Sequence, residues 1–192
     1  MRRREHMKKW IINSRRELLN RRIFTMEELE CYHPEKKITH NFAIINTSDW
    51  INIVPLTDDN RFILIRQHRL GTDEITVETP AGLIEGDEKP ERAAERELLE
   101  ETGYAPKEMI LLKKLTANPS IMSNSIYFFL ARGCRRVAEQ NLDSAENIEI
   151  QLHPLSDVLR MIKENVLNHS IIITALSLYF MSPYCDEEIN YF

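Results

Sequence analysis

The segment "PAGLIEGDEKPERAAERELLEETGY", Pro80–Tyr104, decides the fold. It holds eight carboxylates and three of the chain's five glycines within 25 residues. Pro90 stands where the first turn of a helix tolerates proline, and Gly103 stands where a helix commonly ends, so a helix is predicted near residues 90–101. Because like charges on one helix face repel, so dense a negative run indicates that something positive binds there.

Three of these carboxylates are placed to act together. Glu97, Glu100 and Glu101 have the spacing i, i+3 and i+4, so a helix projects them from one face. Their hard oxygen atoms suit Mg²⁺ or Mn²⁺, and no His/Cys cluster with zinc spacing accompanies them. Arg96 could hold one of them in place. A solvated, Glu-rich helix is the commonest meaning of such a run, so the surrounding positions must decide.

Those positions have a fixed register. Gly82 is followed after five residues by Glu88, and Glu88 after seven residues by Arg96-Glu97-Leu98-Leu99-Glu100-Glu101-Thr102-Gly103-Tyr104. This pattern resembles the Nudix box, with only Tyr104 departing mildly from the usual aliphatic last residue. With ~7% usage per fixed position, a chance match falls below about one in a million.

The resemblance implies a fold and a chemistry. The fold is α+β, an α/β/α sandwich with a mixed β-sheet core and helices on either side. The reaction is hydrolysis of a nucleoside diphosphate linked to a further moiety. A pyrophosphate would be repelled by the carboxylates unless cations lay between them, and such ions also lower the pKa of a bound water. We therefore expect Mg²⁺ as cofactor, with Mn²⁺ as a possible substitute. The implied ligands are Glu97, Glu100, Glu101 and the carbonyl of Ala81, supported by Arg96 and Glu88.

Residues outside the box narrow the resemblance. "IRQHR" followed by "VETPAGLIEGDE" is similar to the ADP-ribose pyrophosphatase and nucleotide-sugar hydrolase branch. That likeness implies that Arg69 reaches the diphosphate and that Glu78 helps to set the substrate pocket. Pro119 lies sixteen residues after Gly103, where this branch often carries a proline. Ser120 follows it in place of the common glycine, which bears on the contacts to the terminal sugar.

The resemblance also suggests a catalytic base. Relatives place a glutamate in the loop before a late strand, and "DSAENIEIQLHPL" supplies Glu146 at the matching place. A carboxylate brought there over the attacking water would collect its proton. From the residues alone Glu146 is an ordinary polar loop residue, and Glu100 is the substitute base.

The N-terminal part has a different character. Residues 1–22 hold nine Arg and Lys against two Glu, and we interpret them as a basic helix with a solvated face and a partial apolar stripe. Binding of nucleic acid or of an anionic membrane is the alternative for this basic arm. "RRIFTMEELECY" and "KKITHNFAIIN" read as strands joined by a turn at His33-Pro34. We divide the chain into residues 1–48, with the helix and these strands, and residues 49–192, the hydrolase domain.

The resemblance assigns these strands a role. Relatives form a swapped dimer in which the N-terminal strands cover the neighbour's site and aromatic rings sandwich the nucleobase. Phe24 and Phe42 are the candidates by position, and core packing is the alternative for each.

The remaining elements follow from local signals. Thr57–Asn60 is a hairpin turn between "DWINIVPL" and "RFILIRQHR". "EITVET", "MILLKKLTA", "SIYFFLAR" and "IEIQLH" are expected as strands. "SDVLRMIKENV" and "SIIITALSLYFM" are expected as helices capped by Ser156 and Ser170.

Composition sets the class of protein. The 192 residues are 43% hydrophobic with a mean hydropathy of −0.38, which suits a globular chain with a core. No apolar run reaches the ~18 residues of a membrane span, and the basic N-terminus lacks the apolar stretch of a signal peptide. Three scattered cysteines favour a reducing cytoplasm.

The sequence thus predicts a Mg²⁺-dependent pyrophosphatase of ADP-ribose or a related nucleotide sugar that yields a nucleoside monophosphate and a sugar phosphate. GDP-mannose or another nucleoside diphosphate-sugar is the alternative substrate. A non-catalytic ligand sensor and an RNA 5′-pyrophosphohydrolase are the alternatives of other classes, and nucleic acid is not the expected partner.

Overall fold

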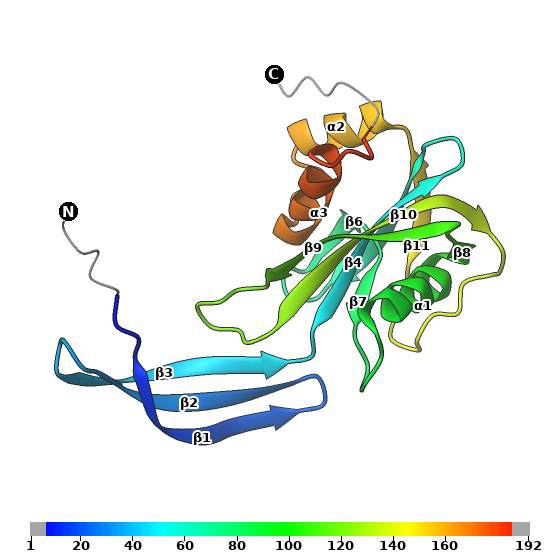
Figure 1. The fold of residues 1–192 in the computed structure, drawn as a ribbon. Helices are drawn as coiled ribbons and strands as arrows, with labels where there is room; N and C mark the ends of the chain where they lie inside the picture. The colour runs from blue at the N-terminus through cyan, green and yellow to red at the C-terminus, as the bar shows by residue number, and fades with distance from the viewer. Residues whose placement is uncertain (1–6, 186–192) are drawn as a thin grey trace, which may run out of the picture. The chain divides into compact units, whose positions relative to one another are not determined.

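Two β-sheets and three helices make up the computed structural model, which describes residues 7–185 (Figure 1). In chain order the elements are β1 (Ile11–Arg21), β2 (Phe24–His33), β3 (Ile38–Thr47), β4 (Trp50–Thr57), β5 (Phe62–Arg69), β6 (Glu74–Glu78), β7 (Ala81–Leu83), α1 (Pro90–Thr102), β8 (Tyr104–Ala105), β9 (Glu108–Thr116), β10 (Ser125–Arg136), β11 (Glu149–His153), α2 (Leu155–Lys163) and α3 (Ser170–Phe180).

The larger sheet is mixed. Its strands follow the order β11-β5-β4-β10-β8, while β6 pairs with β5, β7 with β4 and β9 with β10. β10 runs parallel to β4, and the other pairs with assigned register are antiparallel. The turn between β4 and β5 is the predicted one, because the Asn60 amide donates to the Thr57 carbonyl and Asn60 has a positive φ of 57°.

Helices cover both faces of this sheet. Ile51 and Ile53 of β4 belong to the buried cluster that also contains Ala93 and Leu98 of α1. Side chains alternate along a strand, so Asn52 of β4 points to the opposite face, where α3 packs. This arrangement confirms the predicted α+β sandwich with a mixed sheet.

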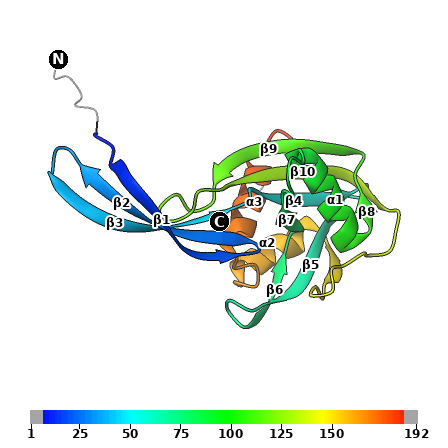
Figure 2. The same ribbon diagram turned by 90° about the horizontal axis from the view of Figure 1, so that it is seen from below.

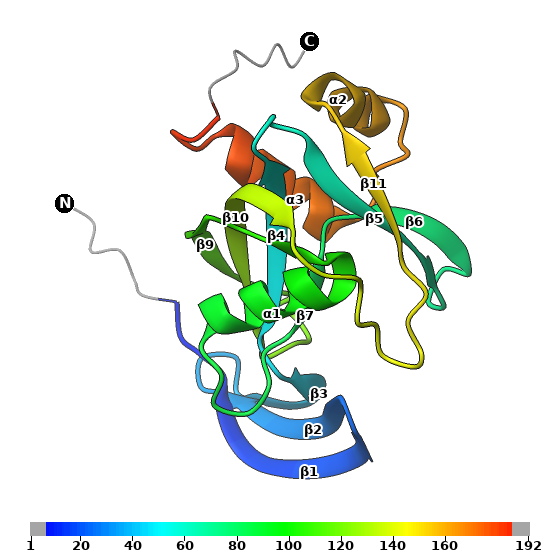
Figure 3. The ribbon, with the colours of Figure 1, turned by 90° about the vertical axis from the view of Figure 1, so that its right-hand side faces the viewer.

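Helix α1 begins and ends as predicted. Pro90 is its first residue, and Gly103 follows its last residue with φ 71° while its amide donates to the Leu99 carbonyl at 2.7 Å. An added Cβ at Gly103 would stand 2.2 Å from the Ala138 carbonyl oxygen. A larger residue at position 103 would therefore clash with the backbone that follows β10. Figure 3 shows that chain running past α1 on its way to β11.

The chain divides into two compact units. One contains the chain up to Ser48 and also Thr116–Asn124, and the other contains Asp49–Leu115 and the chain from Ser125 onwards. Within the first unit, the Ile45 amide donates to the Ile121 carbonyl at 2.7 Å and the Ser123 amide donates to the Ile45 carbonyl at 3.2 Å. The division between residues 48 and 49 remains a prediction.

The first unit is an antiparallel sheet in the order β1-β2-β3 (Figure 2). The predicted N-terminal helix is wrong, because the basic residues from Ile11 to Arg21 form β1; residues 1–6 lie outside the described chain. Arg15 and Arg16 pair with Glu27 and Glu28 of β2 at 3.1 and 2.8 Å. These cross-strand partners favour a strand although its apolar residues also suit a helix.

The predicted serine caps are also wrong. α2 begins after Pro154, which caps it without a side-chain hydrogen bond, so Ser156 lies inside the helix. α3 is capped by the His169 ring, whose Nδ1 accepts the Ile171 amide at 3.2 Å, and Ser170 is the first helical residue. None of the helices in residues 7–185 is long and apolar enough to cross a membrane.

Candidate active site

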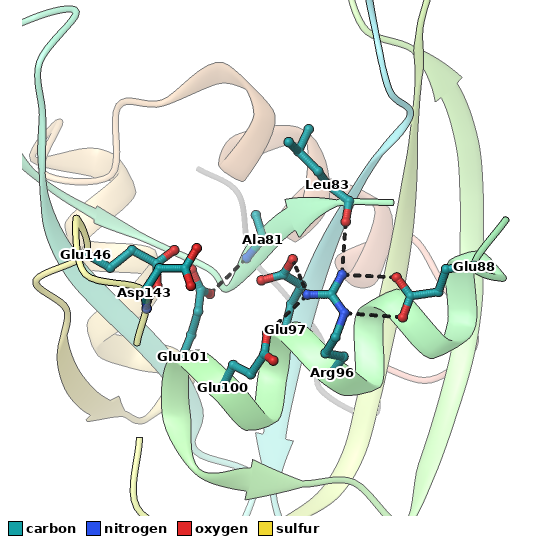
Figure 4. Close-up of polar contacts among 9 residues, drawn as sticks. All are labelled: Ala81, Leu83, Glu88, Arg96, Glu97, Glu100, Glu101, Asp143 and Glu146. Atoms are coloured by element: carbon teal, nitrogen blue, oxygen red, sulfur yellow. Dashed lines mark hydrogen bonds and ion pairs between the residues drawn. The ribbon is translucent and has the colours of Figure 1, made fainter. Parts of the chain in front are cut away.

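The acidic face of α1 is organised by Arg96. Its guanidinium donates to Glu88 through Nε at 3.2 Å and Nη2 at 3.0 Å, and through Nη1 to Glu97 at 2.8 Å and Glu100 at 3.1 Å (Figure 4). Nη2 also donates to the Leu83 carbonyl at 3.1 Å. Hydrogen bonds to Glu88 above all raise the pKa of Arg96. Arg96 therefore ties three carboxylates of the predicted motif to the strand that precedes α1.

Glu97 lies directly against Gly82. A Cβ built on Gly82 would stand 2.0 Å from the Glu97 Cδ, far inside van der Waals contact. Gly82 has no positive φ, so the close approach of this carboxylate is what demands glycine at the start of the motif.

The two carboxylates nearest β7, Glu97 and Glu101, have raised pKa values. Burial raises the pKa of Glu97 to about 7 against the opposing effect of Arg96, and the charges of Glu100 and Glu146 raise it further. Burial likewise raises the pKa of Glu101 well above its ordinary value, although the Ala81 amide donates to its Oε2 at 3.1 Å. These carboxylates lack sufficient counter-charge in the protein alone.

A divalent cation fits this donor set by chemistry. Every side-chain donor is a carboxylate oxygen, which Mg²⁺ and Mn²⁺ prefer. As they stand, no three His, Cys, Asp or Glu side chains in residues 7–185 converge on one ion position. Figure 4 shows that Arg96 contacts Glu97 and Glu100 while the Ala81 amide contacts Glu101. The assignment of Ala81, Glu97, Glu100 and Glu101 as metal ligands remains a proposal.

The structure brings Glu146 to this cluster. Its loop is attached to the C-terminal end of α1, because the Asn141 amide donates to the Glu100 carbonyl at 2.9 Å and Gln140 Nε2 donates to the Glu101 carbonyl at 2.6 Å. Glu146 is exposed, and its Oε2 accepts the Asp143 amide at 2.9 Å. Figure 4 shows its side chain beside Glu101. Its role as base stays a prediction.

Arg69 and Glu78 form a second charged feature. Arg69 donates through Nε and Nη2 to the two Glu78 oxygens at 2.8 and 2.7 Å, and Thr76 Oγ1 donates to the same carboxylate at 2.6 Å. Burial raises the pKa of Glu78, but hydrogen bonds from Arg69 and Thr76 outweigh burial and leave this pKa below its ordinary value. Glu78 is 1% exposed and the Arg69 side chain is 44% exposed, so the carboxylate of this pair is buried while the guanidinium is accessible.

Arg69 and Glu78 line a cavity of about 610 Å³ beside β4 and the start of α3. Its lining includes Arg69, Glu78, Ala81, Gly82 and Asn52. It therefore reaches the residues that contact Glu97 and Glu101. A cavity of this size is within the range of small-molecule sites.

Several lining residues were missed by the sequence reasoning, Asn52 and His169 among them. Asn52 interrupts the apolar strand "WINIVPL", and this interruption was the signal that could have found it. His169 gave no such signal, because its place beside the cavity depends on the packing of α3.

The other predicted substrate residues lie in the first unit. Phe24 of β2 and Phe42 of β3 are half-buried, and Pro119 is exposed in the segment Thr116–Asn124. The Phe42 ring contacts the rings of Trp10 and His40 edge-on at 5.1 and 4.8 Å. Their contacts to substrate remain predictions.

Comparison with known proteins gives a consistent result. A family profile described as NUDIX domain matches residues 49–176. "ADP-ribose pyrophosphatase" of Bacillus subtilis (strain 168) is 28% identical over 146 residues, covering 73% of this chain and 79% of the relative. "ADP compounds hydrolase NudE" of Escherichia coli (strain K12) is 29% identical over 159 residues, covering 82% and 84%. A crystal structure of an ADP compounds hydrolase superposes with a TM-score of 0.81 at 26% identity, covering 91% of this chain and 94% of the other.

Proposed function

The chain belongs to the Nudix family, and on that premise we propose that it hydrolyses the pyrophosphate bond of ADP-ribose or a related nucleotide sugar. Two relatives named for ADP-ribose or ADP compounds support this substrate class. The observation that carries the proposal is the closeness of the acidic α1 face to the cavity, since Ala81 and Gly82 contact Glu101 and Glu97 and also line the cavity.

A divalent cation is the cofactor of this proposal, with Mg²⁺ first and Mn²⁺ as a substitute. Glu97, Glu100, Glu101 and the Ala81 carbonyl would hold it. When bound, such an ion offsets the charge of the diphosphate and lowers the pKa of a water molecule. The raised pKa values of Glu97 and Glu101 support a site that is completed by positive charge.

The protein's own groups supply the remaining steps. Arg69 uses Nε and Nη2 for Glu78, which leaves Nη1 to donate to a phosphate oxygen. Glu146 accepts a proton as water attacks phosphorus and the bridging P–O bond breaks. Arg96 positions Glu97 and Glu100. One water is consumed and two phosphate monoesters leave, which are AMP and ribose 5-phosphate when the substrate is ADP-ribose.

A substrate panel tests this function. ADP-ribose, GDP-mannose, NADH, coenzyme A and nucleoside triphosphates are incubated with Mg²⁺, with and without excess EDTA, and the released phosphate esters are measured. We expect metal-dependent turnover to be highest for a nucleotide sugar. Failure to cleave any nucleotide sugar contradicts the proposal, and binding without turnover under saturating metal favours the sensor alternative.

We also propose that the chain is a homodimer joined through its N-terminal strands. Ile11, Ile23 and Ile38 of that unit are 52%, 59% and 47% exposed, and a second copy of the chain could bury these apolar side chains. The rings of Phe24 and Phe42 would then stack on the nucleobase. Light scattering should give twice the 22.6 kDa of one chain, and a mass of one chain at micromolar concentration overturns the dimer.

A further inference from the structure

The segment that carries Glu146, residues 141–147, is held in place by few contacts; we refer to it as the Glu146 loop. Residues 143–147 are exposed, so side-chain packing does little to fix them. Inside the loop, the Glu146 amide donates to the Asp143 carbonyl and the Asp143 amide donates to Glu146 Oε2, both at 2.9 Å. These bonds orient the Glu146 carboxylate within its own loop. The position of the loop relative to α1 therefore depends on its two ends.

The first end is attached to the C-terminus of α1. The last carbonyl groups of a helix have no partner within the helix, so they are open to other donors. The Asn141 amide donates to the Glu100 carbonyl at 2.9 Å, and the chain just before it is held by the Val137 amide, which donates to the Gly103 carbonyl at 2.9 Å. The second end is Ile148, which is 6% exposed and leads into β11. Both ends are thus anchored, while the loop between them is not.

The Gln140 side chain joins the two ends. Its Nε2 donates to the Glu101 carbonyl of α1 at 2.6 Å and to the Ile148 carbonyl at 3.2 Å. A carboxamide nitrogen carries two hydrogen atoms, so one side chain can serve both acceptors. Gln140 thereby closes the Glu146 loop at its neck, the place where Gln140 meets Ile148. The same bond ties the neck to Glu101, whose carboxylate is one of the proposed metal ligands.

This neck has to withstand repulsion between carboxylates. Burial is the main cause of the raised pKa values of Glu97 and Glu101, and the charge of Glu146 raises both further. Glu146 therefore lies near both groups, as Figure 4 shows for Glu101, and like charges push its exposed loop away from α1. The carboxamide of Gln140 opposes that movement without adding a charge of its own.

We propose that Gln140 is a positioning residue that keeps Glu146 beside α1 by closing the neck of the Glu146 loop. This inference rests on the proposed function, in which Glu146 accepts the proton of the attacking water. Gln140 acts through that carboxylate. A displacement of about 1 Å in a catalytic group can lower the rate about 100-fold, so loss of the neck should reduce kcat while substrate binding is kept.

Replacement of Gln140 by methionine tests the proposal, because methionine keeps most of the side-chain length and removes both N–H donors. With ADP-ribose we expect kcat to fall about tenfold, while KM and the Mg²⁺ concentration for half-maximal rate stay within about twofold of wild type. Gln151→Met is the matched control, since Gln151 lies on β11 and its Nε2 donates to Glu149 of the same strand at 3.3 Å. The control should change none of these quantities.

The Glu146→Gln background separates positioning of the base from a structural role. Once the carboxylate is gone there is no base to position, so Gln140→Met should then lower kcat by less than about twofold. An equal fall in both backgrounds, or a higher Mg²⁺ requirement in Gln140→Met, shows that Gln140 supports α1 instead and overturns the proposal.

Hydrogen exchange of the metal-free protein reads the neck without any turnover. The amides of Asn141, Asp143 and Glu146 donate hydrogen bonds in or beside the loop. Peptides covering residues 141–148 should exchange about tenfold faster in Gln140→Met, whereas peptides from α1 should not change. Unchanged exchange of residues 141–148 overturns the proposal. Thermal unfolding reports on the fold, and Gln140→Leu, which also lacks the donors, replaces the methionine variant should that one not fold.

Two other outcomes are decisive. A fall in kcat of less than threefold in Glu146→Gln itself removes the base from this loop and overturns the positioning role with it. Failure of the wild type to cleave any nucleotide sugar contradicts the proposed function, and the exchange rates then still decide whether Gln140 closes the Glu146 loop.

Discussion

Gly82 and Glu97 lie so close together that any side chain at residue 82 would displace the Glu97 carboxylate. A Cβ there would stand 2.0 Å from Glu97 Cδ and 2.6 Å from its Cγ. We expect Gly82→Ala to cost about 1–3 kcal/mol of unfolding free energy and to lower turnover strongly, because Glu97 must move.

A double-mutant cycle isolates this contact. Urea unfolding of Gly82→Ala, Glu97→Ala and the double variant should show that alanine at 82 costs much less once Glu97 is truncated. Gly71→Ala is the control, since nothing lies within 4 Å of its added Cβ. Strictly additive free energies would mean that the glycine is required for another reason.

The pH dependence of stability should change when Glu97 loses its charge. Its pKa is about 7 in the folded, metal-free protein against 4.5 ordinarily, so the folded state binds the proton more tightly. Wild-type stability therefore contains a contribution that falls as pH rises from 4.5 through 7. Glu97→Gln avoids this loss and should gain up to about 3 kcal/mol over wild type at pH 8.

Denaturant unfolding in EDTA, at pH values from 5 to 8.5, measures that gain. The advantage of the variant should grow between pH 5 and 7 and then level off, while metal-dependent turnover is lost. An advantage that is the same at pH 5 and pH 8 would contradict the assigned ionisation.

Loss of the Arg96 guanidinium should destabilise the protein more than loss of an ordinary surface arginine. Arg96→Met leaves Glu88, Glu97 and Glu100 without their shared cation, and we expect a cost of about 1–3 kcal/mol at pH 8. Arg92→Met is the matched control on the same helix, where the 73% exposed side chain pairs with Glu95, and it should cost under about 1 kcal/mol. Similar costs for the two variants would remove the special role of Arg96.

Turnover should depend on the carboxylate of Glu146. Glu146→Gln keeps the side-chain shape and is expected to lower kcat about 100-fold while metal affinity stays near wild type. Glu139→Gln is the control, since Glu139 is 89% exposed and pairs with Arg136. A loss of less than threefold would transfer the role of base to Glu100.

Local sequence signals predicted many elements of the larger unit, which contains Asp49–Leu115 and the chain from Ser125 onwards. Pro90 and Gly103 fixed both ends of α1 because each acts on its own backbone. The N-terminal strand was missed because its decisive partners, Glu27 and Glu28, lie on another strand. β7 has only three residues, and it forms by pairing with Trp50–Asn52 of β4. Such pairing between distant segments cannot be predicted from a local sequence pattern. Asn52 does interrupt an apolar strand, but only the packing of β4 and α3 shows that it lines the cavity.

The pairing of Ile45 with Ile121 and Ser123 bears on how this protein can be dissected. The polypeptide passes between the two units after residues 48, 115 and 124, so a single cut cannot release either of them intact. A fragment of residues 49–192 would keep Ile121 and Ser123 but would lack Ile45, to which their backbone groups are hydrogen-bonded. Exchange of the N-terminal sheet between relatives should therefore transplant residues 116–124 along with it, as two inserts rather than one.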